Sequence, residues 1–321
     1  MLLVSCYDSS FVKADIKIFA KHFHLEILEL KGITRNTFGF IKMTFKIFMG
    51  MIRNEIAFCW FADFAAFLAV KAANLFHKKV YVIVGGYEVS TLPGYGGLNK
   101  KKGIKRLKYT LNNATKVLTI SDFSKSEIDA LGLNIVPEKI SIGVDLQKEF
   151  PAKTNTVITS GSATKELYQL KGLDVFAKAT INLINYKIKI IGPFEEDIKH
   201  KLSKMNPNIE FTGKLAHEEF LTTLKEAKVF CQLSQRESFG LALLEAMNFG
   251  CIPVISRAGA MPEILGKTGF SCEYGDVENT IIAIQNALKS DQEEAVLNRV
   301  KENFTIEHRE EKLIKLINQE L

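Results

Sequence analysis

Short apolar runs alternate with longer amphipathic segments along the whole chain. Six of these runs predict strands in the first half, at residues 2–6, 25–28, 56–60, 80–84, 116–120 and 139–142. Five more predict strands in the second half, at residues 157–160, 188–191, 209–212, 229–232 and 253–256. Helical spacing of the apolar residues marks intervening segments such as 124–131, 173–182 and 217–227. Continuous Val and Ile runs that alternate with helices predict an α/β protein with parallel sheets covered on both faces.

The segment 147–155 divides two complete alternating sets, and it contains Pro151 among polar residues. We therefore expect two doubly wound, Rossmann-like domains that face a central cleft. The first domain would span residues 1–150, the second 151–290, and a charged helical tail, 291–321, would pack back on the first domain. Sheets of this kind bind ligands at the carboxyl ends of their strands, so the cleft is the expected site.

The hydropathy pattern predicts no membrane span. The most apolar window, 56–76, is interrupted by Asp63, Lys71 and Asn74, and it fits a buried strand followed by a helix. The first residues, 1–6, are too few for a signal peptide and lack a basic leader. We expect a cytoplasmic protein whose membrane contact, if any, is peripheral at the inner face.

The cysteines do not form a metal or disulfide pattern. None of the five belongs to a CxxC pair, and no histidine cluster accompanies them. Cys6, Cys59 and Cys231 lie in apolar runs and fit small core residues. A reducing compartment suits this composition.

Charge is unevenly distributed along a chain of otherwise ordinary globular composition. The 321 residues are 47% hydrophobic and 24% charged, with a formal net charge of +6. Residues 1–150 carry +8 and residues 151–321 carry −2. A basic first half suggests an anionic partner there, such as a membrane surface or a phosphorylated substrate; a generically basic protein is the alternative.

The most informative segment runs from 229 to 263. A predicted strand leads into a polar loop with Glu237, then Gly240, then a helix that carries Glu245 about two turns from its start. Gly240 permits close backbone approach to a ligand, and the helix start offers N–H groups and a positive dipole end to a diphosphate. Carboxylates accept paired hydrogen bonds from vicinal hydroxyls, as in a sugar. Taken alone, the spacing of the two glutamates favours the alternative that Glu245 is an exposed or capping helix residue and Gly240 an ordinary turn.

More of the segment follows an ordered pattern. Glu237-Ser238-Phe239-Gly240 and Glu245-Ala246-Met247 are followed by Gly250-Cys251-Ile252-Pro253-Val254 and by Gly259-Ala260-Met261-Pro262-Glu263. This order resembles the retaining GT-B glycosyltransferases of family 4, the glycosyl transferases group 1, whose signature is E-x-F-G-x-x-x-x-E-A-M, then G-x-P-V, then G-x-x-P-E. The resemblance implies two doubly wound domains and a nucleoside-diphosphate sugar as donor substrate, with no cofactor and no metal.

The resemblance also assigns roles on the donor side. Glu245 would hold the donor ribose, and Glu237 would contact the transferred sugar. Sugar and phosphate would be held by backbone N–H groups around Ser238, Phe239, Gly240 and Leu241. Glu263 is a supporting candidate, and helix capping after Pro262 explains it equally well.

Two lysines and a glycine complete the donor side. Lys165 and Lys171 are six residues apart, where the family usually has an Arg and a Lys that grip the diphosphate. A lysine in place of the arginine offers a point charge rather than a bidentate fork. Their cations would stabilise charge on the departing nucleotide; two solvated surface lysines are the alternative. Gly213, after Phe211 and Thr212, resembles the strand and turn beside the nucleobase.

The acceptor side is less specific. Gly86, Tyr87 and Glu88 follow a predicted strand, where related enzymes have a similar segment or a His. Glu88 is the candidate carboxylate facing the acceptor or the sugar, and Tyr87 lies beside it. A purely structural loop explains these residues equally well.

Two basic segments remain in the first half. Residues 99–108 contain Lys100, Lys101, Lys102, Lys105, Arg106 and Lys108, and residues 38–53 alternate large apolar residues with Lys42, Lys46 and Arg53. Basic amphipathic segments can rest on anionic lipid, although a solvated face and ordinary core residues are the alternative. No recognition motif accompanies the charge, so we do not expect nucleic acid as a partner.

The expected function is transfer of a hexose-type sugar from a nucleoside diphosphate to an acceptor hydroxyl, with retention at the anomeric carbon. A glycan or lipid-linked acceptor in the synthesis of cell-envelope polysaccharide or lipopolysaccharide fits the basic first half. A sugar-nucleotide epimerase or phosphorylase of the same fold, and a non-catalytic partner subunit, are the alternatives.

Overall fold

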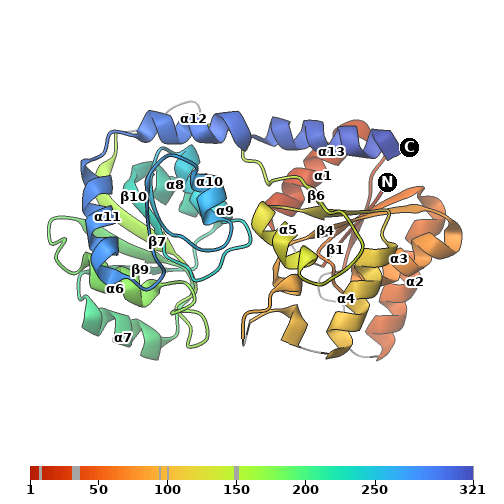
Figure 1. Ribbon diagram of the computed structural model, residues 1–321, viewed down its shortest axis with the longest axis horizontal. Helices are drawn as coiled ribbons and strands as arrows, with labels where there is room; N and C mark the ends of the chain where they lie inside the picture. The colour runs from red at the N-terminus through yellow and green to blue at the C-terminus, as the bar shows by residue number, and fades with distance from the viewer. Residues whose placement is uncertain (7–8, 31–36, 94, 100, 148–151, 321) are drawn as a thin grey trace. The chain divides into compact units, whose positions relative to one another are not determined.

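The computed structural model describes all residues except 7–8, 31–36, 94, 100, 148–151 and 321. The chain forms two compact units (Figure 1): Met1–Gly143 with Ile306–Leu321, and Val144–Thr305. Part of the expected boundary segment, the side chains of Lys101 and Lys102, and all of Lys100 lie outside the description.

The first unit contains a sheet of six parallel strands in the order β2-β1-β3-β4-β5-β6. The strands are β1 (Leu2–Ser5), β2 (Glu26–Glu29), β3 (Ile56–Trp60), β4 (Lys79–Val84), β5 (Lys116–Thr119) and β6 (Glu138–Lys139). The helices are α1 (Ser10–His22), α2 (Thr37–Arg53), α3 (Phe64–Phe76), α4 (Lys101–Asn113), α5 (Asp122–Asp129) and α13 (Ile306–Glu320). Two short 3₁₀ turns are η1 (Tyr87–Val89) and η2 (Gly97–Asn99).

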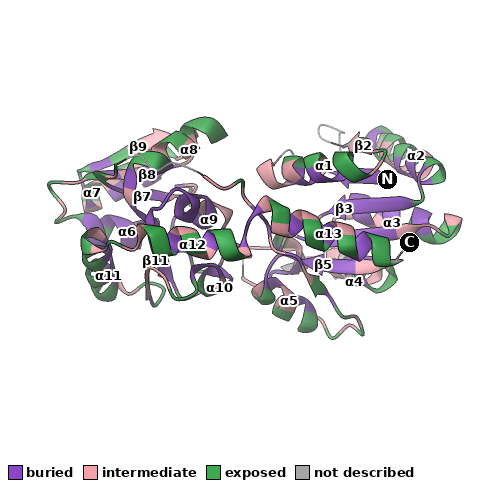
Figure 2. Ribbon diagram, turned by 90° about the horizontal axis from the view of Figure 1, so that it is seen from above, coloured by how far each residue is buried: buried purple, intermediate pink, exposed green. Residues whose placement is uncertain are grey.

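The most apolar window of the sequence forms the centre of this unit. β3 is buried along its length (Figure 2), and it continues into α3, as the interrupted hydropathy predicts. Asp63 caps the start of α3, where its carboxylate accepts hydrogen bonds from the backbone N–H groups of Ala65 and Ala66. α3 packs against β3 and β4 on one side, and α2 and α4 flank it.

The second unit contains the other sheet of six parallel strands, in the order β12-β11-β10-β7-β8-β9. Its strands are β7 (Thr154–Ser160), β8 (Lys187–Ile191), β9 (Ile209–Gly213), β10 (Ala227–Gln232), β11 (Ile252–Ser256) and β12 (Phe270–Cys272). Its helices are α6 (Leu173–Thr180), α7 (Glu196–Met205), α8 (His217–Glu226), α9 (Leu241–Asn248), α10 (Met261–Leu265), α11 (Val277–Lys289) and α12 (Glu293–Asn303).

Each of the eleven expected strands overlaps an observed strand, which confirms the α/β prediction. The twelfth strand, β12, has only three residues and no apolar run of its own. β6, at Glu138–Lys139, overlaps the segment predicted at 139–142 only at Lys139, and Ile140 and Ile142 are buried there outside the strand.

The tail divides between the units. α12 packs on α9 within the second unit, whereas α13 packs on α1 within the first. Arg309 attaches α13 to the first unit, because its guanidinium donates to both carboxylate oxygens of the buried Asp15 on α1. It also donates to the carbonyls of Ile140 and Ser141. The end of the chain is therefore part of the first unit's core.

Candidate functional site

The strand order of the second unit creates a crevice next to its two central strands. β7 connects to β8 on one side of the sheet, and β10 connects to β11 on the other side. The loops that follow β7 and β10 therefore diverge, and such a switch point is where open α/β sheets bind ligands. A pocket of about 320 Å3 lies there. Its lining is Ser160, Gly161, Ser162, Lys171, Ile191, Gly192, Pro193, Gln232, Glu237, Leu241 and Ala242.

A lysine and a glutamate predicted for the donor side meet in this pocket. Lys171 Nζ lies 2.7 Å from Glu237 Oε1, and the Ser234 hydroxyl donates to the same oxygen at 2.9 Å. Burial by itself would raise the pKa of Glu237. The charge and hydrogen bond of Lys171, with hydrogen bonds from Ser234 and Gln232, outweigh burial and hold this pKa below its ordinary value. Glu237 is therefore a carboxylate at neutral pH.

Glycines allow the loop after β10 to touch the loops after β7 and β11 through their backbones. Gly172 has a φ of +66°, and a Cβ there would lie 2.1 Å from the carbonyl oxygen of Leu233. A Cβ on Gly259 would lie 2.2 Å from the carbonyl oxygen of Glu237, and the Ala260 N–H donates to that oxygen at 2.8 Å. The position of Glu237 is thus set by backbone packing on both sides, which holds its carboxylate in place before a ligand arrives.

The start of α9 adjoins this pocket. Gly240 precedes the helix with a φ of +97°, and Leu241, the first helical residue, lines the pocket. Phe239 is buried and packs edge-on against Phe304, so only its backbone is available to a ligand. Ser238, Phe239 and Gly240 are not among the lining residues. The helix start supplies N–H groups and a positive dipole end, as an anion requires.

Glu245 lies closer to the helix start than predicted. It is the fifth residue of α9, about one turn from Leu241 rather than two, because the helix begins only after the polar loop has ended. Its side chain is buried, and His217 Nε2 lies 2.7 Å from its Oε1. Burial raises the pKa of Glu245, and the hydrogen bond and charge of His217 oppose that rise. Glu245 does not line the pocket.

The other predicted donor-side residues also lie outside the pocket lining. Lys165 is exposed, and its backbone N–H donates to Glu195 at 2.9 Å. Gly213 ends β9 with a φ of +74°, and its carbonyl accepts from the Gly192 N–H at 3.0 Å. Glu263 lies in α10, where its carbonyl accepts from Arg299. Of the donor-side predictions, Lys171, Glu237 and Leu241 are the ones that line a common pocket.

Sequence reasoning did not single out Gln232, Ser234 or His217. Gln232 is the last residue of β10 and lines the pocket, and its buried Oε1 accepts no hydrogen bond from any described residue. Its position at the carboxyl end of a strand beside the switch point was the available signal. Ser234 and His217 had no comparable signal. Ser234 contacts Glu237, three residues away, through a loop conformation that has no sequence period, and His217 contacts Glu245, 28 positions away.

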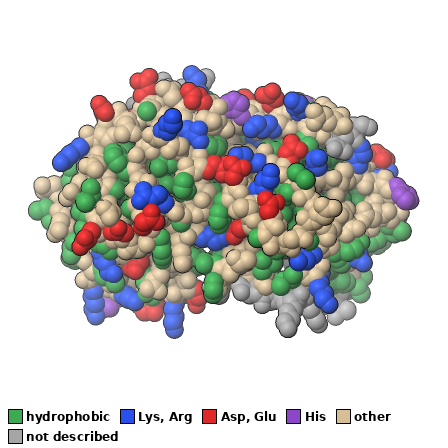
Figure 3. All heavy atoms as spheres, in the orientation of Figure 1, with side chains coloured by type: hydrophobic (Ala, Val, Ile, Leu, Met, Phe, Trp, Pro, Cys, Tyr) green, Lys and Arg blue, Asp and Glu red, His purple; other side chains and the backbone are tan. Residues whose placement is uncertain are grey.

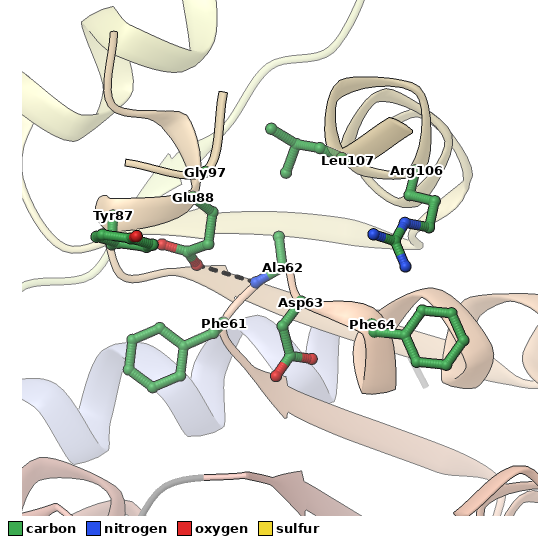
Figure 4. A pocket seen from close by; sticks show the side chains of 10 residues that line it. Phe61, Ala62, Asp63, Phe64, Tyr87, Glu88, Gly97, Arg106 and Leu107 are labelled. Atoms are coloured by element: carbon green, nitrogen blue, oxygen red, sulfur yellow. Dashed lines mark hydrogen bonds between the residues drawn. The ribbon is translucent and has the colours of Figure 1, made fainter. Parts of the chain in front are cut away.

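The acceptor-side candidates line a separate pocket in the first unit. Figure 4 shows this pocket of about 490 Å3, and Tyr87 and Glu88 belong to its lining. Gly86 precedes η1 with a φ of +106°, and Tyr87 is exposed with its ring edge-on to Tyr95. Glu88 Oε1 accepts from the N–H groups of Ala62 at 3.0 Å and Gly85 at 3.1 Å. Burial raises the pKa of Glu88.

Within the described part of the chain, no three His, Cys, Asp or Glu side chains are grouped as a metal ion would need. Cys59, Cys231, Cys251 and Cys272 are buried thiols, and Cys6 is half-buried. Burial raises the pKa of Cys251 to about 11 and that of Cys231 well above its ordinary value, so these thiols stay protonated in the core.

The second unit matches a known protein family, and proteins of known function are similar to this chain. Residues 145–304 match the family model described as glycosyl transferases group 1. A sulfoquinovosyl transferase of Arabidopsis thaliana is 32% identical over 136 residues, 40% of this chain and 26% of that protein. O-antigen chain mannosyltransferase B of Escherichia coli is 27% identical over 245 residues, 67% of this chain and 63% of that protein. The chain thus spans less than two thirds of the length of either relative.

Solved structures resemble the whole chain. The Anabaena HepE protein, crystallised in complex with UDP and glucose, superposes with a TM-score of 0.79 at 15% identity, over 99% of this chain and 98% of that chain. The lipopolysaccharide outer core galactosyltransferase WaaB superposes with a TM-score of 0.71 at 14% identity, over the full length of both chains. The chain therefore has the GT-B fold, and its residues 145–304 belong to the glycosyl transferases group 1 family.

Proposed function

We propose that this chain is a glycosyltransferase that takes a hexose-type sugar from a nucleoside-diphosphate donor and transfers it to an acceptor hydroxyl. The observation that carries the proposal is the Lys171–Glu237 pair in the switch-point pocket of a group 1 domain. A cation and an ionised carboxylate side by side suit a ligand with a diphosphate next to a polyhydroxylated sugar. The start of α9 beside them adds N–H donors for the same diphosphate.

The two lysines have separate tasks in this proposal. Lys171 neutralises charge that develops on the leaving diphosphate, and the exposed Lys165 adds a second cation when its side chain reaches the nucleotide. Glu237 accepts hydrogen bonds from hydroxyls of the transferred sugar, because its lowered pKa keeps it ionised. Backbone N–H groups of Ser238, Phe239 and Gly240 contribute to holding sugar and phosphate.

Glu245 is proposed to hold the donor ribose from the start of α9. Its Oε1 lies against His217 Nε2, so a ribose would share or displace that contact. Binding a pair of ribose hydroxyls would offset the cost of burying this carboxylate. Gly213, at the end of β9, is the candidate on the nucleobase side.

The transfer is proposed to retain the anomeric configuration and to need no metal ion. Both statements rest on the resemblance of residues 237–263 to the retaining family 4 enzymes. The anomeric proton coupling of the product distinguishes retention from inversion by NMR. Turnover that survives EDTA supports the metal-free proposal, and loss that Mg2+ or Mn2+ restores contradicts it.

A nucleotide-sugar screen by thermal shift tests the donor proposal. A ligand that binds only the folded protein raises its apparent stability. Uridine and guanosine diphosphate sugars come first, because similar proteins were crystallised with UDP or are named as GDP-mannose-dependent. Binding accompanied by slow donor hydrolysis supports an enzyme. Failure of every nucleotide sugar to bind supports a non-catalytic partner subunit instead.

The acceptor is proposed to be a glycan or a lipid-linked molecule of the cell envelope, used at the cytoplasmic face of the membrane. No helix among the described residues is long and apolar enough to cross a bilayer. α2, however, exposes five large apolar side chains: Phe38, Phe40, Ile41, Phe45 and Ile52. The same helix carries Lys42, Lys46 and Arg53 and no acidic residue.

Charge complementarity points to an anionic bilayer as the occupant of the exposed face of α2. The face of the molecule drawn in Figure 3 carries interspersed basic and acidic side chains, as an ordinary solvated surface does. α2 differs because its exposed apolar residues are accompanied by Lys42 and Lys46 and by no acidic residue of the helix, whereas Arg53 at its end pairs with Glu26 of β2. Peripheral binding to anionic vesicles would support this part of the proposal.

A further inference from the structure

The pocket of the first unit combines apolar walls with three acidic or basic side chains, Asp63, Glu88 and Arg106 (Figure 4). The Asp63 carboxylate is engaged in capping the start of α3. It lies at the carboxyl ends of β3 and β4, where Phe61, Ala62 and Phe64 form one wall and Leu107 of α4 reaches in from the other. Its volume of about 490 Å3 is ample for a small organic ligand. An apolar cavity of this size favours a ligand that has a hydrocarbon part.

Glu88 contributes an acceptor oxygen that the protein does not use. Its Oε1 is held by the Ala62 and Gly85 N–H groups, which fixes the carboxyl group in the wall. Its Oε2 is buried and has no hydrogen-bond partner among the described residues. Such a group is costly unless something hydrogen-bonds to it, so a hydroxyl-bearing ligand would remove the cost.

Arg106 contributes a cation on the α4 side. Its guanidinium lies 5.1 Å from the centre of the Phe64 ring. A guanidinium that stacks on an aromatic wall keeps its donors available for a phosphate or carboxylate. The pocket therefore offers a site for an anion next to its apolar surface.

Backbone strain marks the same place. Phe61 has a φ of +71°, which is uncommon for a residue with a side chain, and Gly85 must lack one because a Cβ would lie 2.3 Å from the Phe61 ring. Strain of about 1–3 kcal/mol per residue tends to persist where a ligand or a mechanism needs it. Phe61 lines the pocket, so the strain places an aromatic ring in its wall.

The pocket also joins the exposed apolar face of α2. The Phe40 ring of α2 lies 5.1 Å from the Phe64 ring, centre to centre, and Phe40 itself is exposed. Apolar surface therefore continues from the outside of α2 to the wall of the pocket. A molecule anchored in a bilayer could follow this surface with its hydrocarbon part.

We infer that the first-unit pocket binds an amphipathic glycosyl acceptor: a hydrocarbon part against Phe61, Phe64 and Leu107, an anionic group at Arg106, and a hydroxyl that donates to Glu88 Oε2. This inference rests on the proposed function and narrows the acceptor to lipid-linked molecules. Glu88 positions the hydroxyl in this arrangement. The anion and the hydrocarbon part determine which acceptors fit.

Three soluble probes separate the chemical features of such an acceptor. Octyl phosphate has the chain and the anion, octyl β-glucoside has the chain and hydroxyls, and inorganic phosphate has the anion alone. Binding is measured by isothermal titration and saturation-transfer NMR, below the concentration at which the amphiphiles form micelles. We expect both amphiphiles to bind the full chain, and octyl phosphate to bind far more tightly than inorganic phosphate.

Four variants test the assignment. Arg106→Gln should weaken octyl phosphate about tenfold and leave octyl β-glucoside unchanged, since it removes one charge-assisted contact. Lys105→Gln, the neighbouring exposed residue outside the pocket, should change neither. Glu88→Gln should weaken octyl β-glucoside several-fold, because an N–H donor replaces one acceptor oxygen. Ala62→Leu fills the pocket and should weaken both amphiphiles.

Unchanged binding of octyl phosphate to both Arg106→Gln and Ala62→Leu would overturn the inference. Cooperative melting of each variant shows that it is folded, and the two surface variants at positions 105 and 106 keep the test decisive if Ala62→Leu fails to fold. Nucleotide-sugar binding is measured on the same samples. If no nucleotide sugar binds while the amphiphiles do, the proposed function fails and the pocket assignment stands.

Discussion

Lys171 Nζ contacts Glu237 Oε1 at 2.7 Å, although the two residues are 66 positions apart in the sequence. Lys171 follows β7 and Glu237 follows β10, the two central strands from which the second sheet extends in opposite directions. The contact thus joins the two loops that diverge at the switch point. It places a cation and an ionised carboxylate in one pocket.

Removing the lysine should impair donor use more than donor binding. We expect Lys171→Gln to lower kcat/KM for the donor about 100-fold or more, because the variant lacks the preorganised cation that stabilises the leaving diphosphate. The pKa of Glu237 should rise, since burial is then opposed by fewer favourable contacts. The acidic limb of the pH–rate profile should move to higher pH. Lys178→Gln, an exposed lysine on α6, is the matched control and should leave both readouts unchanged.

The role of Glu245 can be tested through the ribose. We expect wild-type protein to bind a nucleoside diphosphate more tightly than its 2′-deoxy analogue, because a carboxylate recognises the vicinal hydroxyl pair. Glu245→Ala should weaken the ribonucleotide severely and remove this preference. Calorimetric titration with both nucleotides measures it.

Two variants on α8 show whether the effect belongs to Glu245. His217→Asn removes the partner of Glu245 and should have a smaller effect than loss of the carboxylate itself. Glu218→Gln changes an exposed neighbouring glutamate and should have none. A Glu245→Ala protein that keeps the ribose preference would refute the assignment.

The buried ion pair between Arg309 and Asp15 should contribute strongly to the free energy of unfolding of the first unit. Arg309→Met leaves a buried carboxylate without its cation, so we expect a loss of about 3–5 kcal/mol in the free energy of unfolding. Trp60, the only tryptophan, donates to Asp15 Oδ2 at 2.8 Å. Urea unfolding followed by its fluorescence therefore reports on this unit. Lys312→Gln, exposed on the same helix, should leave the midpoint in place.

The buried Glu88 carboxylate should lower the free energy of unfolding of the first unit at neutral pH, compared with an uncharged side chain at this position. Burial raises its pKa, so the folded state binds the proton more tightly than the unfolded chain. Stability of the wild type must then fall as pH rises through the pKa of Glu88. Glu88→Gln has no such proton, so its Tm should exceed that of the wild type at pH 7.5, with a gap that shrinks towards pH 4.5. A gap that stays constant with pH would contradict this explanation.

The exposed face of α2 should govern vesicle binding. We expect the double variant Phe38→Ser, Phe45→Ser to lose most binding to vesicles that contain anionic lipid, because it removes two large apolar side chains from that face. Lys42→Gln with Lys46→Gln should reduce the dependence of binding on anionic lipid and on low salt. Ile184→Ser removes an exposed apolar residue of the second unit and serves as the control. Co-sedimentation measures all of these proteins.

Much of the fold was readable from local patterns. Continuous Val and Ile runs separated by helical periodicity predict β1 to β5 and β7 to β11, because buried parallel strands need apolar residues on both faces. The sequence did not predict β12, because a strand of three residues, Phe270–Cys272, has no apolar run long enough to show a period. The prediction that Glu245 lies about two turns into α9 was wrong by one turn. The residue at which a helix begins depends on loop packing as well as on periodicity.

The sequence alone also determined the family and the residue types predicted for the donor side. The order of residues 237–263 and the lysine at 171 can be recognised in the sequence without knowledge of the fold. Only the tertiary structure decided which of these residues meet. Lys171 and Glu237 share a pocket because parallel strands bring the carboxyl ends of β7 and β10 to one edge. Glu245 pairs with His217, and Glu88 with the backbone of Ala62, through packing between distant segments. Such contacts have no sequence period. The motif at 237–247 therefore predicts the donor chemistry, whereas the pocket of the first unit became visible only in the fold.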